Sequence, residues 1–159
     1  MLTPVLMLLI LTLPQLLNRA LVRLRGGAAS AAPAAWGLGL LFLFTASGHF
    51  VQTQPMVLML PEWVPAREAL VHATGVLEIA IALAFFVPRW RRAAGWAAAA
   101  VLVAFFPANV YAAFQQVPMG GHAWGPVYLL IRGPLQLIIL WWTWRFVLRS
   151  VRVDNTAHE

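Results

Sequence analysis

Five long apolar stretches, separated by short polar or proline-rich segments, dominate the pattern of this chain. They cover Leu2–Leu17, Ala34–Phe50, Ala69–Val87, Ala93–Phe114 and Val127–Leu148. A helix needs about 20 apolar residues, with a range near 17–25, to cross the hydrocarbon core of a bilayer. The last three stretches meet that length, and the second does so if its helix extends past His49. We therefore expect an all-α membrane protein, with a four-helix transmembrane bundle and an additional N-terminal transmembrane helix.

The first stretch, Leu2–Leu17, is the weakest of the five because Pro4 and Pro14 interrupt it. It is compatible with a spanning helix, an interfacial helix or a cleaved targeting segment. A signal peptide carries basic residues before its apolar core, whereas here the arginines follow it, which favours a retained helix. We divide the chain into three parts: 1–33, this helix with a basic cytoplasmic linker; 34–148, the four-helix bundle; and 149–159, a short cytoplasmic tail.

Composition places the chain in the membrane class. Its 159 residues are 62% hydrophobic and 10% charged, whereas soluble domains average about 45–50% apolar and 25% charged residues. Length leaves no room for a separate soluble domain. There is no cysteine and the four histidines are scattered, so disulfides, thiolate chemistry and a metal site are not expected.

The basic residues indicate how the chain crosses the membrane. The net charge of +6 comes from arginine, and most arginines lie next to the ends of apolar stretches. If the chain crosses at each stretch, one side carries Arg19, Arg23, Arg25, Arg89, Arg91, Arg92, Arg145, Arg149 and Arg152. The positive-inside rule makes that side cytoplasmic. We expect a multi-pass protein of the bacterial inner membrane, with its N-terminus outside, its C-terminus in the cytoplasm and no nucleic-acid partner.

Other residues fit this topology. The tryptophans fall near the expected boundaries, where an indole is half-hydrated: Trp36, Trp90, Trp96, Trp141, Trp142 and Trp144 inside, and Trp63 and Trp124 outside. The proline-rich segment 55–65 predicts an interfacial or re-entrant cap, because prolines interrupt helices. His122, in a glycine-rich outer loop, is expected to be solvated.

Polar side chains interrupt four of the five stretches. A carboxylate near the bilayer centre costs about 2.5–3.5 kcal/mol on insertion scales, so such groups usually face a partner or a wet cavity. With the topology above, the interrupting groups all fall in the outer half of the bundle. They are the ligand-binding candidates His49, Glu78, Asn109, Arg132 and Gln136. His49 and Glu78 are also the candidate catalytic residues.

A structural interpretation of the same residues stays open. Glu78 and Arg132 can form an ion pair that holds two helices together. Asn109 and Gln136 can satisfy the backbone carbonyls that two intrahelical prolines leave without donors. Interhelical polar contacts of this kind average about 0.6 kcal/mol in membranes, which makes them ordinary elements of a bundle.

An ordered series of short motifs resembles the DoxX-like family of small bacterial integral membrane proteins. The motifs are Gly48-His49-Phe50, Gly75-Val76-Leu77-Glu78, Arg91-Arg92 with Gly95-Trp96, Phe106-Pro107-Ala108-Asn109 and Arg132-Gly133-Pro134-Leu135-Gln136. The resemblance covers Ala34–Arg145 and implies a four-helix bundle to which Leu2–Leu17 is an addition. Some relatives are associated with quinone-linked oxidation, including a thiosulfate:quinone oxidoreductase subunit, so the resemblance suggests a membrane quinone as ligand or cofactor.

Three functions follow as expectations. The leading one is a binding protein for a hydrophobic molecule with a polar head, quinone- or isoprenoid-like, accessory to a membrane redox or envelope process. Asn109, Arg132 and Gln136 would hydrogen-bond the head, and Glu78 would pair with Arg132 or move a proton. The second is a lipid-substrate isomerase or reductase with Glu78 and His49 as acid–base pair. The third is a purely structural subunit. The expected partners are the bilayer, a hydrophobic small molecule, and a membrane redox protein or a second copy of the chain.

Overall fold

The computed structural model describes residues 2–26 and 30–149, which are mainly helical and contain no strand. Five helices are long and apolar enough to cross a membrane, which confirms the predicted all-α membrane class. The long helices are α1 (Leu2–Arg25), α2 (Ala32–Val51), α4 (Arg67–Phe86), α5 (Arg91–Phe114) and α6 (Leu129–Thr143). The shorter elements are α3 (Thr53–Val57), the 3-10 turns η1 (Pro88–Trp90) and η2 (His122–Tyr128), and a π-helical turn, η3 (Trp144–Leu148), that continues α6.

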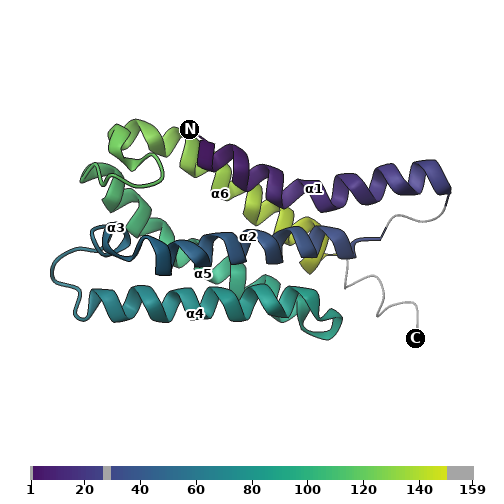
Figure 1. The fold of residues 1–159 in the computed structure, drawn as a ribbon, viewed down its shortest axis with the longest axis horizontal. Helices are drawn as coiled ribbons and strands as arrows, with labels where there is room; N and C mark the ends of the chain where they lie inside the picture. Colours follow the sequence, from purple (N-terminus) through teal and green to yellow (C-terminus); the bar gives the residue numbers. More distant parts are fainter. Residues whose placement is uncertain (1, 27–29, 150–159) are drawn as a thin grey trace.

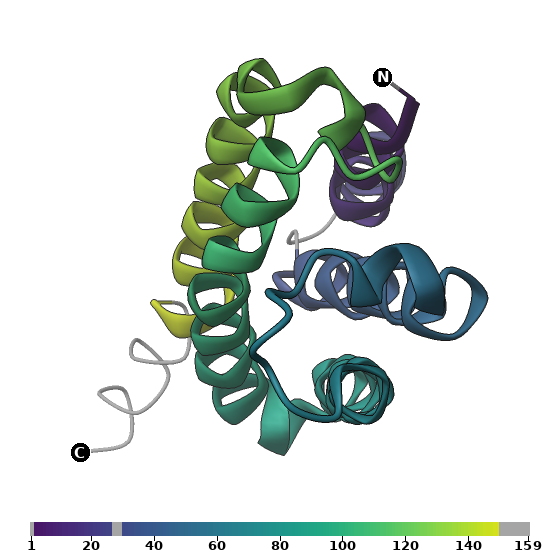
Figure 2. The same cartoon turned by 90° about the vertical axis from the view of Figure 1, so that its left-hand side faces the viewer.

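The helices pack around α2. In the end-on view of Figure 2, α2 lies between α1 and α4, and α5 and α6 stand side by side opposite them. The contact between α2 and α4 is the most extensive in the bundle, followed by that between α1 and α2. The η2 segment joins α5 to α6 across one end of the bundle (Figure 2).

Helix α1 is longer than its apolar stretch. It continues beyond Leu17 to Arg25, so Arg19, Arg23 and Arg25 lie on a helix that projects past its neighbours (Figure 1). Gly37 of α2 fixes the crossing of these two helices, because a Cβ at this position would collide with the backbone carbonyl oxygen of Leu11.

The arginines that were expected on one side of the membrane lie at one end of the bundle. The end of α1, the start of α2, the α4–α5 connection and the end of α6 gather at the right of Figure 1. The described members of the arginine set therefore share that end, while Arg152 lies outside the described residues. At the other end, α3 is followed by turns through residues 58–66, so the proline-rich segment contains no long helix.

The hydrophobic core occupies the arginine half of the bundle. Its members come from all five long helices and include Leu11, Leu38, Phe85, Ala98 and Ile139. Trp142 belongs to this core and donates a hydrogen bond from Nε1 to the carbonyl oxygen of Ala34 at 3.2 Å. The prediction that Trp142 is a half-hydrated boundary residue was therefore wrong. Its indole N–H bonds to a backbone carbonyl of α2, so it does not require water at the membrane interface.

Candidate functional site

A cavity of about 590 Å³ opens in the half of the bundle away from the arginine end. All five long helices contribute to its wall, which is mainly apolar. Pockets for small molecules typically have about 300–1,000 Å³ and a few polar groups in an apolar lining. The wall contains all five residues predicted as ligand-binding, namely His49, Glu78, Asn109, Arg132 and Gln136.

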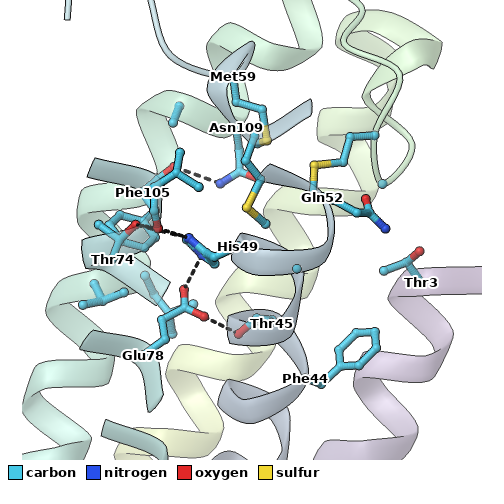
Figure 3. Close-up of a pocket in the computed structure, with 18 of the residues that line it drawn as sticks. Thr3, Phe44, Thr45, His49, Gln52, Met59, Thr74, Glu78, Phe105 and Asn109 are labelled. Carbon is cyan, nitrogen blue, oxygen red and sulfur yellow. Dashed lines mark hydrogen bonds and ion pairs between the residues drawn. The ribbon is translucent and has the colours of Figure 1, made fainter. Parts of the chain in front are cut away.

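Glu78 and His49 form a buried pair between α4 and α2. The carboxylate oxygen Oε1 lies 3.5 Å from Nε2 of His49, and the other oxygen, Oε2, is 2.6 Å from the hydroxyl of Thr45. Figure 3 shows the three side chains converging at the cavity wall. The two candidate catalytic residues are thus in direct contact.

The backbone fixes which nitrogen of His49 meets the carboxylate. Nδ1 lies 2.7 Å from the carbonyl oxygen of Val71, and a carbonyl only accepts, so Nδ1 carries a hydrogen. The hydroxyl of Thr74 lies 3.2 Å from the same nitrogen. Nε2 is therefore the nitrogen that faces Oε1 of Glu78, and the two side chains have the arrangement of an acid–base pair.

Sequence spacing and one glycine position this pair. Thr45 and His49 are four residues apart on α2, and Thr74 and Glu78 are four apart on α4, so each couple shares a helix face. Gly75 brings the helices together, because an added Cβ would lie 2.7 Å from Cβ of His49. Thr45 and Thr74 were missed as site residues, although their spacing from His49 and Glu78 was the available signal.

Arg132 pairs with Asn109 and not with Glu78. Its Nε donates to Oδ1 of Asn109 at 3.0 Å, and its Nη1 lies 3.8 Å from the sulfur of Met7. Within the described part of the chain, no ion pair joins Arg132 to Glu78. The predicted Glu78–Arg132 pair is therefore corrected: rotation of α4 and α6 directs the carboxylate to α2 and the guanidinium to α5.

The two amides mainly serve the backbone of α5. Asn109 donates from Nδ2 to the carbonyl oxygen of Phe105 at 2.8 Å, as Figure 3 shows, and Gln136 donates from Nε2 to that of Leu102 at 2.9 Å. The carbonyls that Pro107 and Pro134 leave without a helical donor are those four residues earlier, Val103 and Leu130. The two amides therefore bind backbone, as the structural interpretation expected, but not the two carbonyls that it named, and both side chains still border the cavity.

His122 differs from its expected solvated state. It is the first residue of η2 and is buried; its ring meets Tyr128 edge-on with centroids 4.9 Å apart, and both residues line the cavity. Nδ1 lies 2.7 Å from the carbonyl oxygen of Met119, whereas Nε2 is buried without a hydrogen-bond partner among the described residues. Gly121 makes this packing possible, since its φ is +107° and a Cβ there would strike the Tyr128 ring. The glycine pair before His122 suggested only a loop.

Comparison with known proteins identifies a family whose function is unknown. No curated protein and no solved structure matches the chain. A family model described as a domain of unknown function, DUF8561, matches residues 38–147, from α2 to the end of the bundle. The match covers more than half of the chain and includes all five predicted ligand-binding residues, but leaves out α1. The chain is a member of the DUF8561 family.

Proposed function

We propose that this protein binds a hydrophobic molecule with a polar head, quinone- or isoprenoid-like, within its membrane bundle, as an accessory of a redox or envelope process. The observation that carries the proposal is the cavity of about 590 Å³, whose mainly apolar wall contains the five polar residues. An apolar wall suits a hydrocarbon tail, and a few convergent polar groups suit a head. Arg132 contacts the head, and Asn109 orients Arg132 through the 3.0 Å hydrogen bond.

Native mass spectrometry of the protein released from its own membranes tests the proposal directly. We expect a co-purified hydrophobic molecule in the wild type. Ala108 of α5 lines the cavity, so Ala108→Phe should fill part of the space and lower the bound fraction. Val103, on the same helix, is 59% exposed and does not line the cavity, so Val103→Phe is the matched control. Equal bound fractions in both variants, or no bound molecule in the wild type, would contradict the proposal.

A second candidate, acid–base catalysis on a lipid-like substrate, is favoured by the Glu78–His49 contact. Oε1 and Nε2 lie 3.5 Å apart, so a small approach of the two side chains would bring them to the distance at which a proton passes. An isomerase of this kind takes a proton from one carbon of its substrate and returns one to another. In D₂O, the co-purified molecule should then gain deuterium in the wild type and not in Glu78→Gln. Binding without deuterium incorporation would contradict the catalytic candidate and leave binding as the only supported function.

The resemblance to DoxX-like proteins and the arginine distribution support the cellular setting of this proposal. Arginines gathered at one end of the bundle favour a cytoplasmic location for that end. The cavity then lies toward the outer face of the inner membrane, with the N-terminus outside and the C-terminus inside. Such a cavity is reached from the outer leaflet, where quinones and isoprenoid lipids are available to it.

A further inference from the structure

We infer that the head of the bound molecule is acidic, a carboxylate or a phosphate, and that Arg132 receives it. This inference rests on the proposed function and names the chemical class of its ligand. It depends on three features of Arg132: the hydrogen-bond donors left unused, the charge of the groups around it, and its place on the cavity wall.

Several N–H groups of the Arg132 guanidinium have no hydrogen-bond partner among the described residues. Arginine carries five N–H groups in a planar fork. Within the described part of the chain, one on Nε is used by Asn109 and one on Nη1 by the Met7 sulfur, which leaves three without a partner. The bond to Asn109 holds Nε at α5, and the contact with Met7 holds Nη1 at α1. Two adjacent N–H groups of such a fork match two oxygens of a carboxylate or phosphate.

No carboxylate among the described residues contacts Arg132. Glu78 is the only carboxylate among the described residues that line the cavity; it lies 3.5 Å from His49 and acts on Arg132 only through its charge at longer range. The contacts of Arg132 itself are a neutral amide and a thioether. A buried charge is favourable only when an opposite charge joins it, so the position beside the guanidinium suits an anionic group of the ligand.

The position of Arg132 leaves two sources for the anion. Arg132 is three residues after the start of α6 at Leu129, roughly 5 Å along the helix at 1.5 Å per residue. At this depth the acidic head can belong to a molecule held in the cavity or to a bilayer phospholipid at the cavity mouth. Both supply the same chemistry, an anionic oxygen for the Arg132 fork, and the experiment below separates them.

Binding to the full chain in phosphatidylcholine nanodiscs tests the inference. The probes are an isoprenyl monophosphate, the isoprenol with the same tail, oleate and a short-tailed quinone. The wild type should bind the phosphate and oleate about tenfold or more tightly than the isoprenol, as expected for charge-assisted hydrogen bonds. Arg132→Gln should remove this preference. Arg132→Lys should keep the preference with weaker binding, because it retains the charge and loses the fork.

The matched control is Arg92→Gln, which removes one positive charge at an exposed site outside the cavity and should leave every dissociation constant unchanged. Loss of wild-type anion binding in nanodiscs containing phosphatidylglycerol, by competition at Arg132, would identify a bilayer lipid as the source of the anion. Equal wild-type affinities for phosphate and isoprenol would overturn the inference. Binding of the quinone alone would also overturn it while leaving the proposed function intact, whereas no binding of any probe would remove both.

Discussion

At the residue scale, the polar side chains of the cavity form two separate groups. Glu78, His49 and Thr45 connect α4 to α2, and Arg132 and Asn109 connect α6 to α5. The first group pairs a carboxylate with an imidazole, and the second contains a guanidinium bonded to an amide. A molecule in the cavity therefore meets an acid–base pair at one part of the wall and an anion-binding group at another.

Mutational coupling should follow these groups. Glu78→Gln and His49→Gln each remove one side of a direct contact. A double-mutant cycle should give a coupling between about 0.6 kcal/mol, the average for interhelical contacts in membranes, and about 1.7 kcal/mol, their maximum. The measurement is the unfolding free energy in detergent. The cycle between Glu78→Gln and Arg132→Gln is the control and should give a smaller coupling. A larger coupling to Arg132 than to His49 would show that the pairing described here is wrong.

The sequence placed five polar residues in one half of the bundle, where they line one cavity, but the predicted contact between Glu78 and Arg132 was wrong, for a physical reason. Depth along a helix follows from residue counting at a fixed rise, which is why five residues expected in one half of the bundle line one cavity. Which neighbour a side chain meets depends on the rotation of each helix and on where helices cross. Glu78 turns to His49 because Gly75 lets α4 approach α2, and sequence pattern alone does not set that crossing.

At the element scale, close helix approach depends on individual glycines. Gly75 allows contact between α4 and α2 beside His49, and Gly37 allows α2 to cross α1. Helical Gly133 of α6, in contrast, has no atom within 4 Å of the position that a Cβ would take. The same residue type is therefore a packing requirement on α2 and α4 and is unconstrained by neighbours on α6.

Gly75→Ala and Gly133→Ala should accordingly have opposite effects. The methyl group at position 75 would lie 2.7 Å from Cβ of His49, so the helices must separate, at a cost of about 1–3 kcal/mol. At position 133 the methyl group meets open space, and loss of glycine from a helix should stabilise the protein by up to about 1 kcal/mol. Thermal unfolding in detergent measures both. A neutral Gly75→Ala would mean that α2 and α4 do not cross closely at His49.

Trp142 should be more important to stability than its exposed neighbour. Trp142→Phe loses the 3.2 Å hydrogen bond to Ala34, which ties α6 to α2, and should cost about 0.5–1.5 kcal/mol. Trp141 is 54% exposed, so Trp141→Phe is the matched control with little expected effect. Chemical unfolding of the two variants side by side provides the measurement, and equal losses would contradict the assignment of Trp142 to the core.

At the scale of the whole molecule, the two halves of the bundle differ. The arginine half is packed with apolar side chains, whereas the other half encloses the cavity and is capped by α3 and η2. Five long apolar stretches made the helices predictable, and the polar residues within them predicted a pocket in the outer half. The size and apolar lining of the cavity were not predictable, because they depend on how the helices diverge beyond the core and on the buried packing of His122 and Tyr128 within η2.

Orientation in the membrane can be measured with single cysteines, since the natural chain has none. Glu62 and Arg92 are exposed and lie at opposite ends of the bundle. By the positive-inside rule, a membrane-impermeant maleimide should label Glu62→Cys in intact spheroplasts and Arg92→Cys only after lysis. The reverse pattern would invert the proposed orientation, and labelling of both sites from outside would contradict the crossing of the membrane by α4.

Helix α1 gives the cavity a wall that the family domain does not supply. Thr3 and Met7 line the cavity, yet the family match begins at residue 38. Of the five candidate spans, α1 is also the least buried, so fewer side chains hold it in place than hold its neighbours. Under the proposed function, lateral exchange between cavity and bilayer would be easiest past α1. Differences in this helix between members of the family would then change which molecules enter and how fast, without any change to the polar residues of the wall.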